Sequence, residues 1–168
     1  MEKVLNFFDQ GGGLLWAILA VSVLMWMLIL ERYWFFYVQL PRLKAELLDH
    51  WRNRSPSLPH FNEQRLKDSL TSQYFKQVFR GLKTVDILTQ ILPLLGLLGT
   101  VSGMIKVFEV INAFGAGNAR GMAAGISEAL ITTMAGLITA LSGLFFAASL
   151  ESRARHARER FTAQLTDQ

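Results

Sequence analysis

The chain has 168 residues, of which 51% are hydrophobic, 18% are charged and none is cysteine, and its formal net charge is +4. Without cysteine it has no disulfide framework and no thiolate metal site. The hydrophobic residues gather in three blocks, 11–30, 87–105 and 121–150, in which Glu128 is the one charged residue. A hydrocarbon core of about 30 Å needs roughly 20 apolar residues, so each block is long enough to span a membrane. A soluble bundle of buried helices would instead show polar stripes along a solvent face.

The first block follows a short polar segment, residues 1–10, which we expect in the periplasm. A signal peptide is the alternative, but the block is longer than a usual h-region and no A-x-A-like site precedes Glu31. Residues 11–32 are therefore predicted to form a retained transmembrane helix. The aromatic cluster 33–37 that follows is typical of side chains that anchor at the level of the lipid headgroups.

Residues 33–86 are predicted to form a cytoplasmic helical loop. Residues 40–86 hold nine Lys or Arg against five Asp or Glu, and cytoplasmic loops carry such an excess. A basic segment can also bind nucleic acid, but two flanking spans favour the loop, so we expect no nucleic-acid partner. Ser55–Pro59 interrupts the segment, and the second helix, with apolar residues from Leu66 to Leu82 at helical spacing, is expected to run straight into the membrane.

Residues 87–114 are predicted to form the second transmembrane helix. Gly96, Gly99 and Gly103 give it small-residue faces, which in lipid serve close helix packing. Pro93 removes one backbone hydrogen bond, and the sequence leaves open whether it is a built kink or a tolerated bend. Lys106 and Glu109, three residues apart, are expected to pair at the membrane interface.

A periplasmic turn, 115–120, leads to the third transmembrane helix, 121–150, and a helical cytoplasmic tail, 151–168. One stripe of this helix is small and polar throughout: Gly121, Gly125, Glu128, Thr132, Ala135, Thr139 and Ser142. A carboxylate within a span is costly and normally faces a bundle interior or water. We therefore interpret the stripe as the lining of a lumen; the alternative is that its hydroxyls bond their own backbone. Gly136 lies on a second small stripe beside it.

These segments predict an all-α membrane protein with three transmembrane helices and helical cytoplasmic extensions. Its N-terminus lies outside and its C-terminus inside. The small faces are expected to join copies of the chain into a homo-oligomeric pore. No residue pattern indicates catalysis, a cofactor or a metal, so we do not expect an enzyme.

Two segments resemble the MotA/TolQ/ExbB proton-channel family: Leu94–Gly103 (LLGLLGTVSG) and Gly125–Leu137 (GISEALITTMAGL), together with Phe108. The length of the chain favours the ExbB branch, in a compact form. By residue match, Thr100 and Thr133 are the pore hydroxyls and Glu128 is the family's intramembrane glutamate. Pro93 matches the proline before the glycine run.

The resemblance implies a homopentamer in the inner membrane of a Gram-negative bacterium, with the second and third helices lining a central pore for protons. An ExbD-like partner with one span and an intramembrane aspartate would lie inside the pore. A TonB-like protein would receive the work, which energises outer-membrane transport. A TolQ-like subunit of an envelope-maintenance motor and a non-conducting membrane scaffold are the alternatives.

The depths of Thr100 and Thr133 in the membrane support their assignment as a pair of pore hydroxyls. Thr100 lies 15 residues before Gly115, and Thr133 lies 13 residues after Arg120. At about 1.5 Å per residue they lie roughly 22 and 20 Å from the same turn, so near one level. The stripe through Glu128 contains Thr132 rather than Thr133, and periodicity alone leaves open which of the two faces a pore.

The Lys/Arg asymmetry gives a direct prediction of topology. Cysteines introduced at Ser57 and Asn118 are expected to react from opposite sides of the membrane with an impermeant thiol reagent. In intact spheroplasts only the cysteine at position 118 is expected to be labelled, and lysis exposes the other. Labelling of position 57 from the periplasmic side would overturn this topology.

Overall fold

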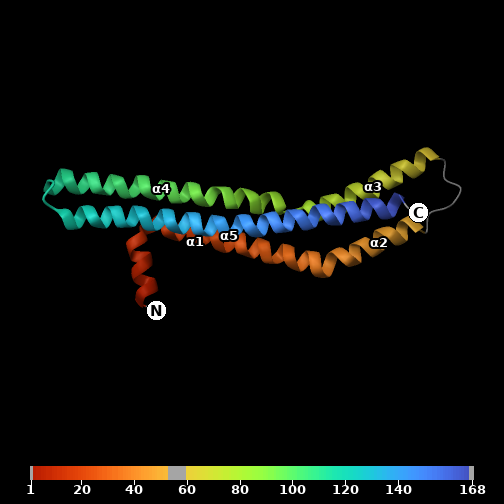
Figure 1. The fold of residues 1–168 in the computed structure, drawn as a ribbon, viewed down its shortest axis with the longest axis horizontal. Helices are drawn as coiled ribbons and strands as arrows, with labels where there is room; N and C mark the ends of the chain where they lie inside the picture. The colour runs from red at the N-terminus through yellow and green to blue at the C-terminus, as the bar shows by residue number, and fades with distance from the viewer. Residues whose placement is uncertain (1, 53–59, 167–168) are drawn as a thin grey trace. The chain divides into compact units, whose positions relative to one another are not determined.

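A computed structural model describes residues 2–52 and 60–166. The regular structure in these residues is helical: α1 (Glu2–Trp34), the π-helical turn η1 (Phe35–Gln39), α2 (Leu40–Arg52), α3 (His60–Phe79), α4 (Leu82–Phe114) and α5 (Ala119–Thr166) (Figure 1). Within residues 2–52 and 60–166, three helices are long and apolar enough to cross a membrane. The predicted all-helical membrane fold is therefore confirmed for the described residues. The expected break at Ser55–Pro59 lies outside them.

The bounds of α4 and α5 test three expectations about helix continuity. α5 is one helix of 48 residues and includes the charged segment 151–160, as predicted. α4 contains Pro93 within its length and does not end there. The expectation that the helix before the second span enters it without a break was wrong, because Gly81 separates α3 from α4. Its φ of +77° is a left-handed conformation that ends a helix and that glycine adopts without steric cost.

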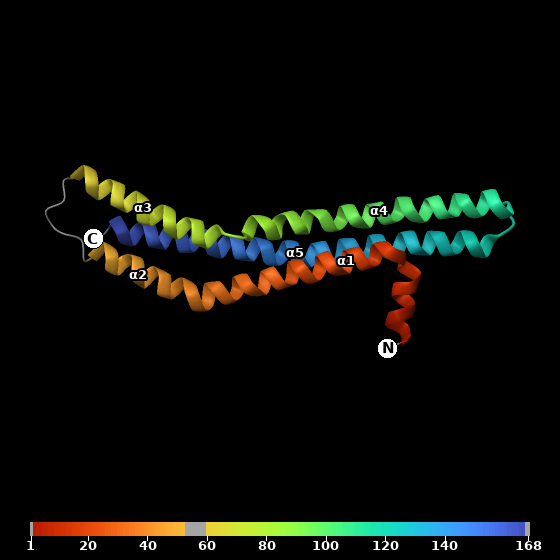
Figure 2. The ribbon, with the colours of Figure 1, turned by 180° about the vertical axis from the view of Figure 1, so that it is seen from behind.

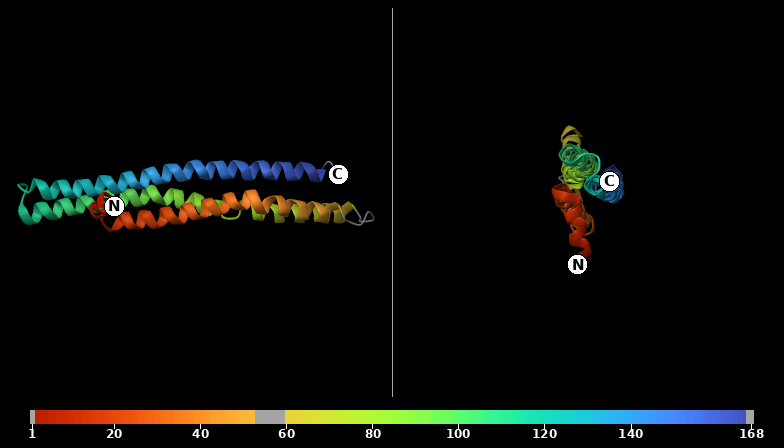
Figure 3. Two further views of the ribbon diagram at one scale, coloured as in Figure 1. Left: turned by 90° about the horizontal axis from the view of Figure 1, so that it is seen from below. Right: turned by 90° about the vertical axis from the view of Figure 1, so that its left-hand side faces the viewer.

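The first of two compact units consists of Met1–Met27 and Val85–Phe145. In it, α4 and α5 lie side by side and antiparallel, joined by a short turn (Figures 1 and 3). Seen from behind, α1 runs along α5 (Figure 2). Met25 of α1 is fully buried and lies against Gly143, where a Cβ would also lie 3.1 Å from the Thr89 hydroxyl. The apolar stripes of three helices thus share one contact region.

A sharp bend lies within α1 at Gly12. Its φ of 63° and ψ of −169° interrupt the helix, and this conformation is almost confined to glycine. The residues before it turn away from the rest of α1 (Figures 1 and 3). The apolar part of α1 therefore begins next to this bend.

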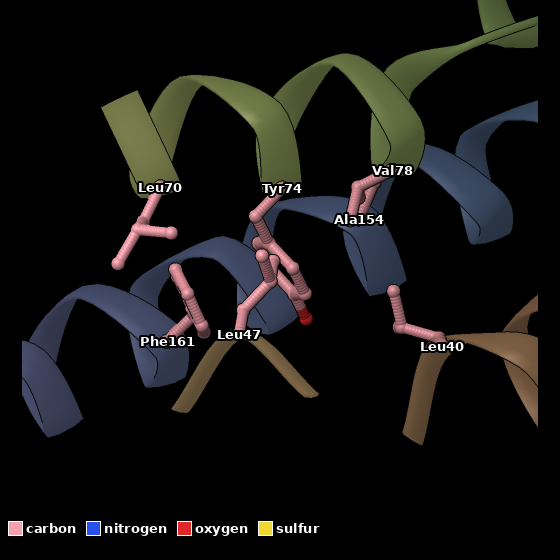
Figure 4. Packing of buried hydrophobic residues seen from close by; sticks show 7 residues of the cluster. All are labelled: Leu40, Leu47, Leu70, Tyr74, Val78, Ala154 and Phe161. Carbon is pink, nitrogen blue, oxygen red and sulfur yellow. The ribbon is translucent and has the colours of Figure 1, made fainter. Parts of the chain in front are cut away.

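The second unit consists of Leu28–Thr84 and Phe146–Gln168. Its core is made by side chains from α2, α3 and α5 that point toward one another (Figure 4): Leu40, Leu47, Leu70, Tyr74, Val78, Ala154 and Phe161. The rings of Tyr74 and Phe161 stack with their centroids 4.1 Å apart. Burial raises the pKa of the Tyr74 phenol above its ordinary 10.0, so the ring stays neutral within this apolar contact.

Aromatic side chains of the 33–37 cluster also hold the basic start of the tail. The guanidinium of Arg153 lies 5.6 Å from the ring centre of Tyr33 and 5.8 Å from that of Tyr37. The Tyr33 hydroxyl donates a hydrogen bond to the Ser149 hydroxyl at 3.3 Å. These rings, which the sequence indicated as headgroup anchors, therefore make cation–π contacts within the chain.

The stacked pair predicts the cost of opening the core of the second unit. Phe161 is fully buried, so Phe161→Ala is expected to lower the free energy of unfolding by about 3–5 kcal/mol through lost contacts and a cavity. Phe161→Leu fills most of that space and is expected to cost clearly less. Thermal unfolding in detergent, followed by circular dichroism, compares both variants with the parent chain. An alanine variant that melts like the parent would contradict this core.

Candidate functional site

Close contact between the backbones of α4 and α5 is the first feature of the candidate site. Gly96, Gly99 and Gly103 are buried on one face of α4. A Cβ on Gly103 would lie 2.7 Å from the carbonyl oxygen of Gly125, and one on Gly136 would lie 3.0 Å from the Cα of Gly96. Real Cβ atoms rarely or never approach so closely, so the contact depends on glycines on both faces.

These glycines therefore have their expected packing role, but within one chain. Within this chain the small faces join α4 to α5, and the joining of separate copies stays a prediction. The physical reason is proximity along the chain: Gly115 ends one helix and α5 begins at Ala119. The short turn brings the small face of α5 against that of α4.

Thr132 lies inside this contact and is 1% exposed. A Cβ on Gly99 would collide with its side chain. The Thr132 hydroxyl contacts the backbone oxygens of Glu128 and Ala129, each at 3.0 Å, and Thr139 bonds the carbonyl four residues earlier in the same way. The alternative that these hydroxyls bond their own helix thus holds for both. The stripe that we interpreted as the lining of a lumen is, at Thr132, a face packed against α4.

Thr133 and Thr100 lie at the edge of the contact, and both are half-buried. The Thr133 hydroxyl donates across the helices to the Gly96 carbonyl oxygen at 2.9 Å and lies 3.1 Å from that of Ala129. The Thr100 hydroxyl donates to the Leu97 carbonyl oxygen at 2.6 Å. Each hydroxyl oxygen still has lone pairs that accept a hydrogen bond, and each O–H can rotate to another acceptor.

The two hydroxyls lie at similar depths, as the residue counts suggested. Thr133 contacts Gly96, which is four residues from Thr100 on α4, so the offset is about one helical turn, or roughly 6 Å. Exposed apolar side chains surround them on both helices: Leu97, Leu98, Val101, Leu130, Met134 and Leu137. The site is thus a pair of hydroxyls between a buried helix contact and an apolar outer surface.

Glu128 forms an ion pair that the sequence analysis missed. The Lys106 ammonium donates to both carboxylate oxygens of Glu128, at 2.6 and 2.7 Å. The pairing of Lys106 with Glu109 was therefore wrong. Glu109 is exposed, whereas the Glu128 side chain is only 17% exposed and gains more from a partner because water screens it less. The sequence did contain a signal for this pair. Lys106 lies nine residues before Gly115 and Glu128 lies eight residues after Arg120, so both lie at a similar distance from the same turn.

Gly12 is the other residue that sequence reasoning missed. A Cβ on Gly12 would collide with the Glu128 carboxylate and lie 3.6 Å from the Lys106 ammonium. The sequence shows only three successive glycines at the start of an apolar block, so it carries no signal for this contact. Within the described part of the chain, no three His, Asp or Glu side chains gather where they could hold a metal ion.

The amino-acid sequence is similar to those of several known proteins. A sequence model described as the MotA/TolQ/ExbB proton channel family matches residues 43–163. The chain is 30% identical to a "Putative biopolymer transport protein ExbB-like 1" of Synechocystis, over 84% of this chain and 68% of the relative. It is 28% identical to "Biopolymer transport protein exbB1" of Vibrio cholerae, over 84% and 76%. It is 26% identical to an ExbB-like protein of Helicobacter pylori, over 87% and 86%.

The backbone contact gives a prediction for glycine substitutions. A Cβ on Gly136 would lie 2.7 Å from the carbonyl oxygen of Leu92, and backbone cannot move aside as a side chain can. Gly136→Ala is therefore expected to cost about 1–3 kcal/mol, the usual range for overpacking. Gly117, which has open space around it, supplies the control, and Gly117→Ala is expected to be neutral. Thermal unfolding of both proteins in detergent measures the difference; equal stabilities would contradict the contact.

Proposed function

This chain belongs to the MotA/TolQ/ExbB proton channel family, and we propose that it is the ExbB-type subunit of a motor in the inner membrane of a Gram-negative bacterium. The motor uses the proton-motive force to energise TonB-dependent transport across the outer membrane. Relatives named as biopolymer transport proteins support this role. The chain's N-terminus lies in the periplasm, and residues 33–86 and 151–168 lie in the cytoplasm, in line with their excess of Lys and Arg.

The observation that carries the proposal is the pair of half-buried hydroxyls, Thr100 and Thr133, in an otherwise apolar region. Charge in the middle of a membrane is costly, so protons cross on a protonatable group or along water held by polar groups. The spans contain hydroxyls at this depth but no Asp or His. The two threonines therefore hold water and donate hydrogen bonds to a carboxylate that another chain brings.

That chain is an ExbD-like protein with one spanning helix and an intramembrane aspartate. It lies inside a pore formed by five copies of this chain, whose second and third spans face it. The exposed apolar surfaces of α4 and α5 are available to the neighbouring copies, the partner helix and lipid. A TonB-like protein receives the resulting motion.

Thr→Val substitutions test this role, since they keep the shape of the side chain and remove its O–H. A hydrogen bond to a charged group contributes about 1.5–3 kcal/mol, which corresponds to roughly a ten- to hundredfold fall in rate. Thr100→Val and Thr133→Val are therefore each expected to lose most iron–siderophore uptake in cells that depend on this chain and its partner.

Thr132→Val is the matched control. The Thr132 hydroxyl is buried and bonded to its own helix, so this substitution is expected to lower uptake only mildly. Expression levels and co-purification of the partner show whether each variant still assembles. Wild-type uptake by both the Thr100 and Thr133 variants would reject the pore role and favour a scaffold.

A further inference from the structure

The ion pair between Lys106 and Glu128 differs from an ordinary surface salt bridge in its burial. Lys106 donates two short hydrogen bonds to one carboxylate, and the two side chains are 49% and 17% exposed. The carboxylate is thus largely withdrawn from water, while the ammonium reaches it from the exposed side. Because α4 supplies the lysine and α5 the glutamate, the pair joins the two helices near their connecting turn.

A third helix closes over this pair. The bend at Gly12 brings the backbone of α1 so near to Glu128 that even a methyl group at position 12 would collide with the carboxylate. The φ and ψ of Gly12 are themselves almost restricted to glycine. Gly13, the next residue, has nothing within 4 Å of its own Cβ position. The close approach therefore belongs to one glycine of the three.

We propose that Lys106 is a positioning residue for Glu128, and that Lys106, Glu128 and the Gly12 backbone form a lock between α1, α4 and α5. In this lock, which we name the Gly12–Lys106–Glu128 lock, the carboxylate is held by its two hydrogen bonds and covered by α1. Glu128 therefore fixes the helices and does not carry protons. The effect of the lock on transport rests on the proposed function, whereas its effect on stability does not.

Because Lys106 and Glu128 are unequally buried, removing the charge of one is expected to cost more stability than removing the charge of the other. Lys106→Met leaves a largely buried carboxylate without its partner, and an unpaired buried charge is strongly destabilising. Glu128→Gln leaves an ammonium that is half exposed and that water can solvate. We therefore expect Lys106→Met to lower the melting temperature by several degrees and uptake by roughly tenfold or more. Glu128→Gln loses the ion pair but leaves no unpaired buried charge, so it is expected to lower both by a smaller amount.

The double variant Lys106→Met/Glu128→Gln separates the lock from a proton-carrying role. It removes both charges, so the penalty of the unpaired carboxylate disappears, and stability and uptake are expected to return to the level of Glu128→Gln alone. If Glu128 carries protons, every variant without the carboxylate loses uptake, the double variant included. Lys106→Arg keeps a cation at this position and is expected to retain uptake. Glu109→Gln removes a nearby exposed carboxylate and serves as the control.

Gly12→Ala and Gly13→Ala test the part that α1 contributes. The first is expected to lower the melting temperature and uptake, because alanine is strained in the backbone conformation of Gly12 and its methyl group displaces the carboxylate. The second is expected to leave both unchanged.

Purified protein in detergent gives the melting temperatures, and iron–siderophore uptake gives the transport rates. The lock is rejected if Lys106→Met is as stable as the parent chain, or if the double variant stays as inactive as Lys106→Met. If the threonine variants show wild-type uptake but Lys106→Met is unstable and the double variant recovers, the proposed proton role fails while the lock stands.

Discussion

The fold of the first unit depends on the close approach of two backbones in a region where neither helix gains by leaving lipid. Lipid tails are as apolar as leucine, so van der Waals contact and hydrogen bonds must hold α4 to α5. Gly96 and Gly136 supply that contact, and its closeness lets the Thr133 hydroxyl reach a carbonyl of α4. The same register places Lys106 level with Glu128. The glycines at the contact thus determine where the polar groups of this unit meet.

Much of this fold was predictable from the sequence, because length and periodicity are local properties. The apolar blocks, the small faces and the continuation of α5 beyond residue 150 all follow from composition and spacing. The break at Gly81 was not predicted, since a glycine within a helical pattern is often tolerated. Nor does periodicity say what covers a face. It identified Gly96 and Gly136 as packing residues, but only the hairpin decides that their partner lies in the same chain.

The candidate site shows the same limit at single residues. Thr132 shares the small polar stripe with Glu128, and periodicity alone left open whether Thr132 or Thr133 faces a pore. The structure shows that this part of the stripe packs against α4. Thr132 lies on the stripe and is therefore buried. Thr133 is one residue further, about 100° around the helix, and emerges at the edge of the contact. The family resemblance selected Thr133, and its pore-facing role stays a prediction.

The distribution of charge follows from this arrangement and limits what the chain can do alone. Glu128 is the one charged residue within the apolar blocks, and Lys106 already occupies both of its oxygens. The hydroxyls of Thr100 and Thr133 remain as polar groups on the half-buried edge. A hydroxyl orients water and stabilises a nearby carboxylate, but at neutral pH it neither gains nor loses a proton readily. On the proposed function, this chain guides a proton carrier without being one, and a second chain brings the carrier.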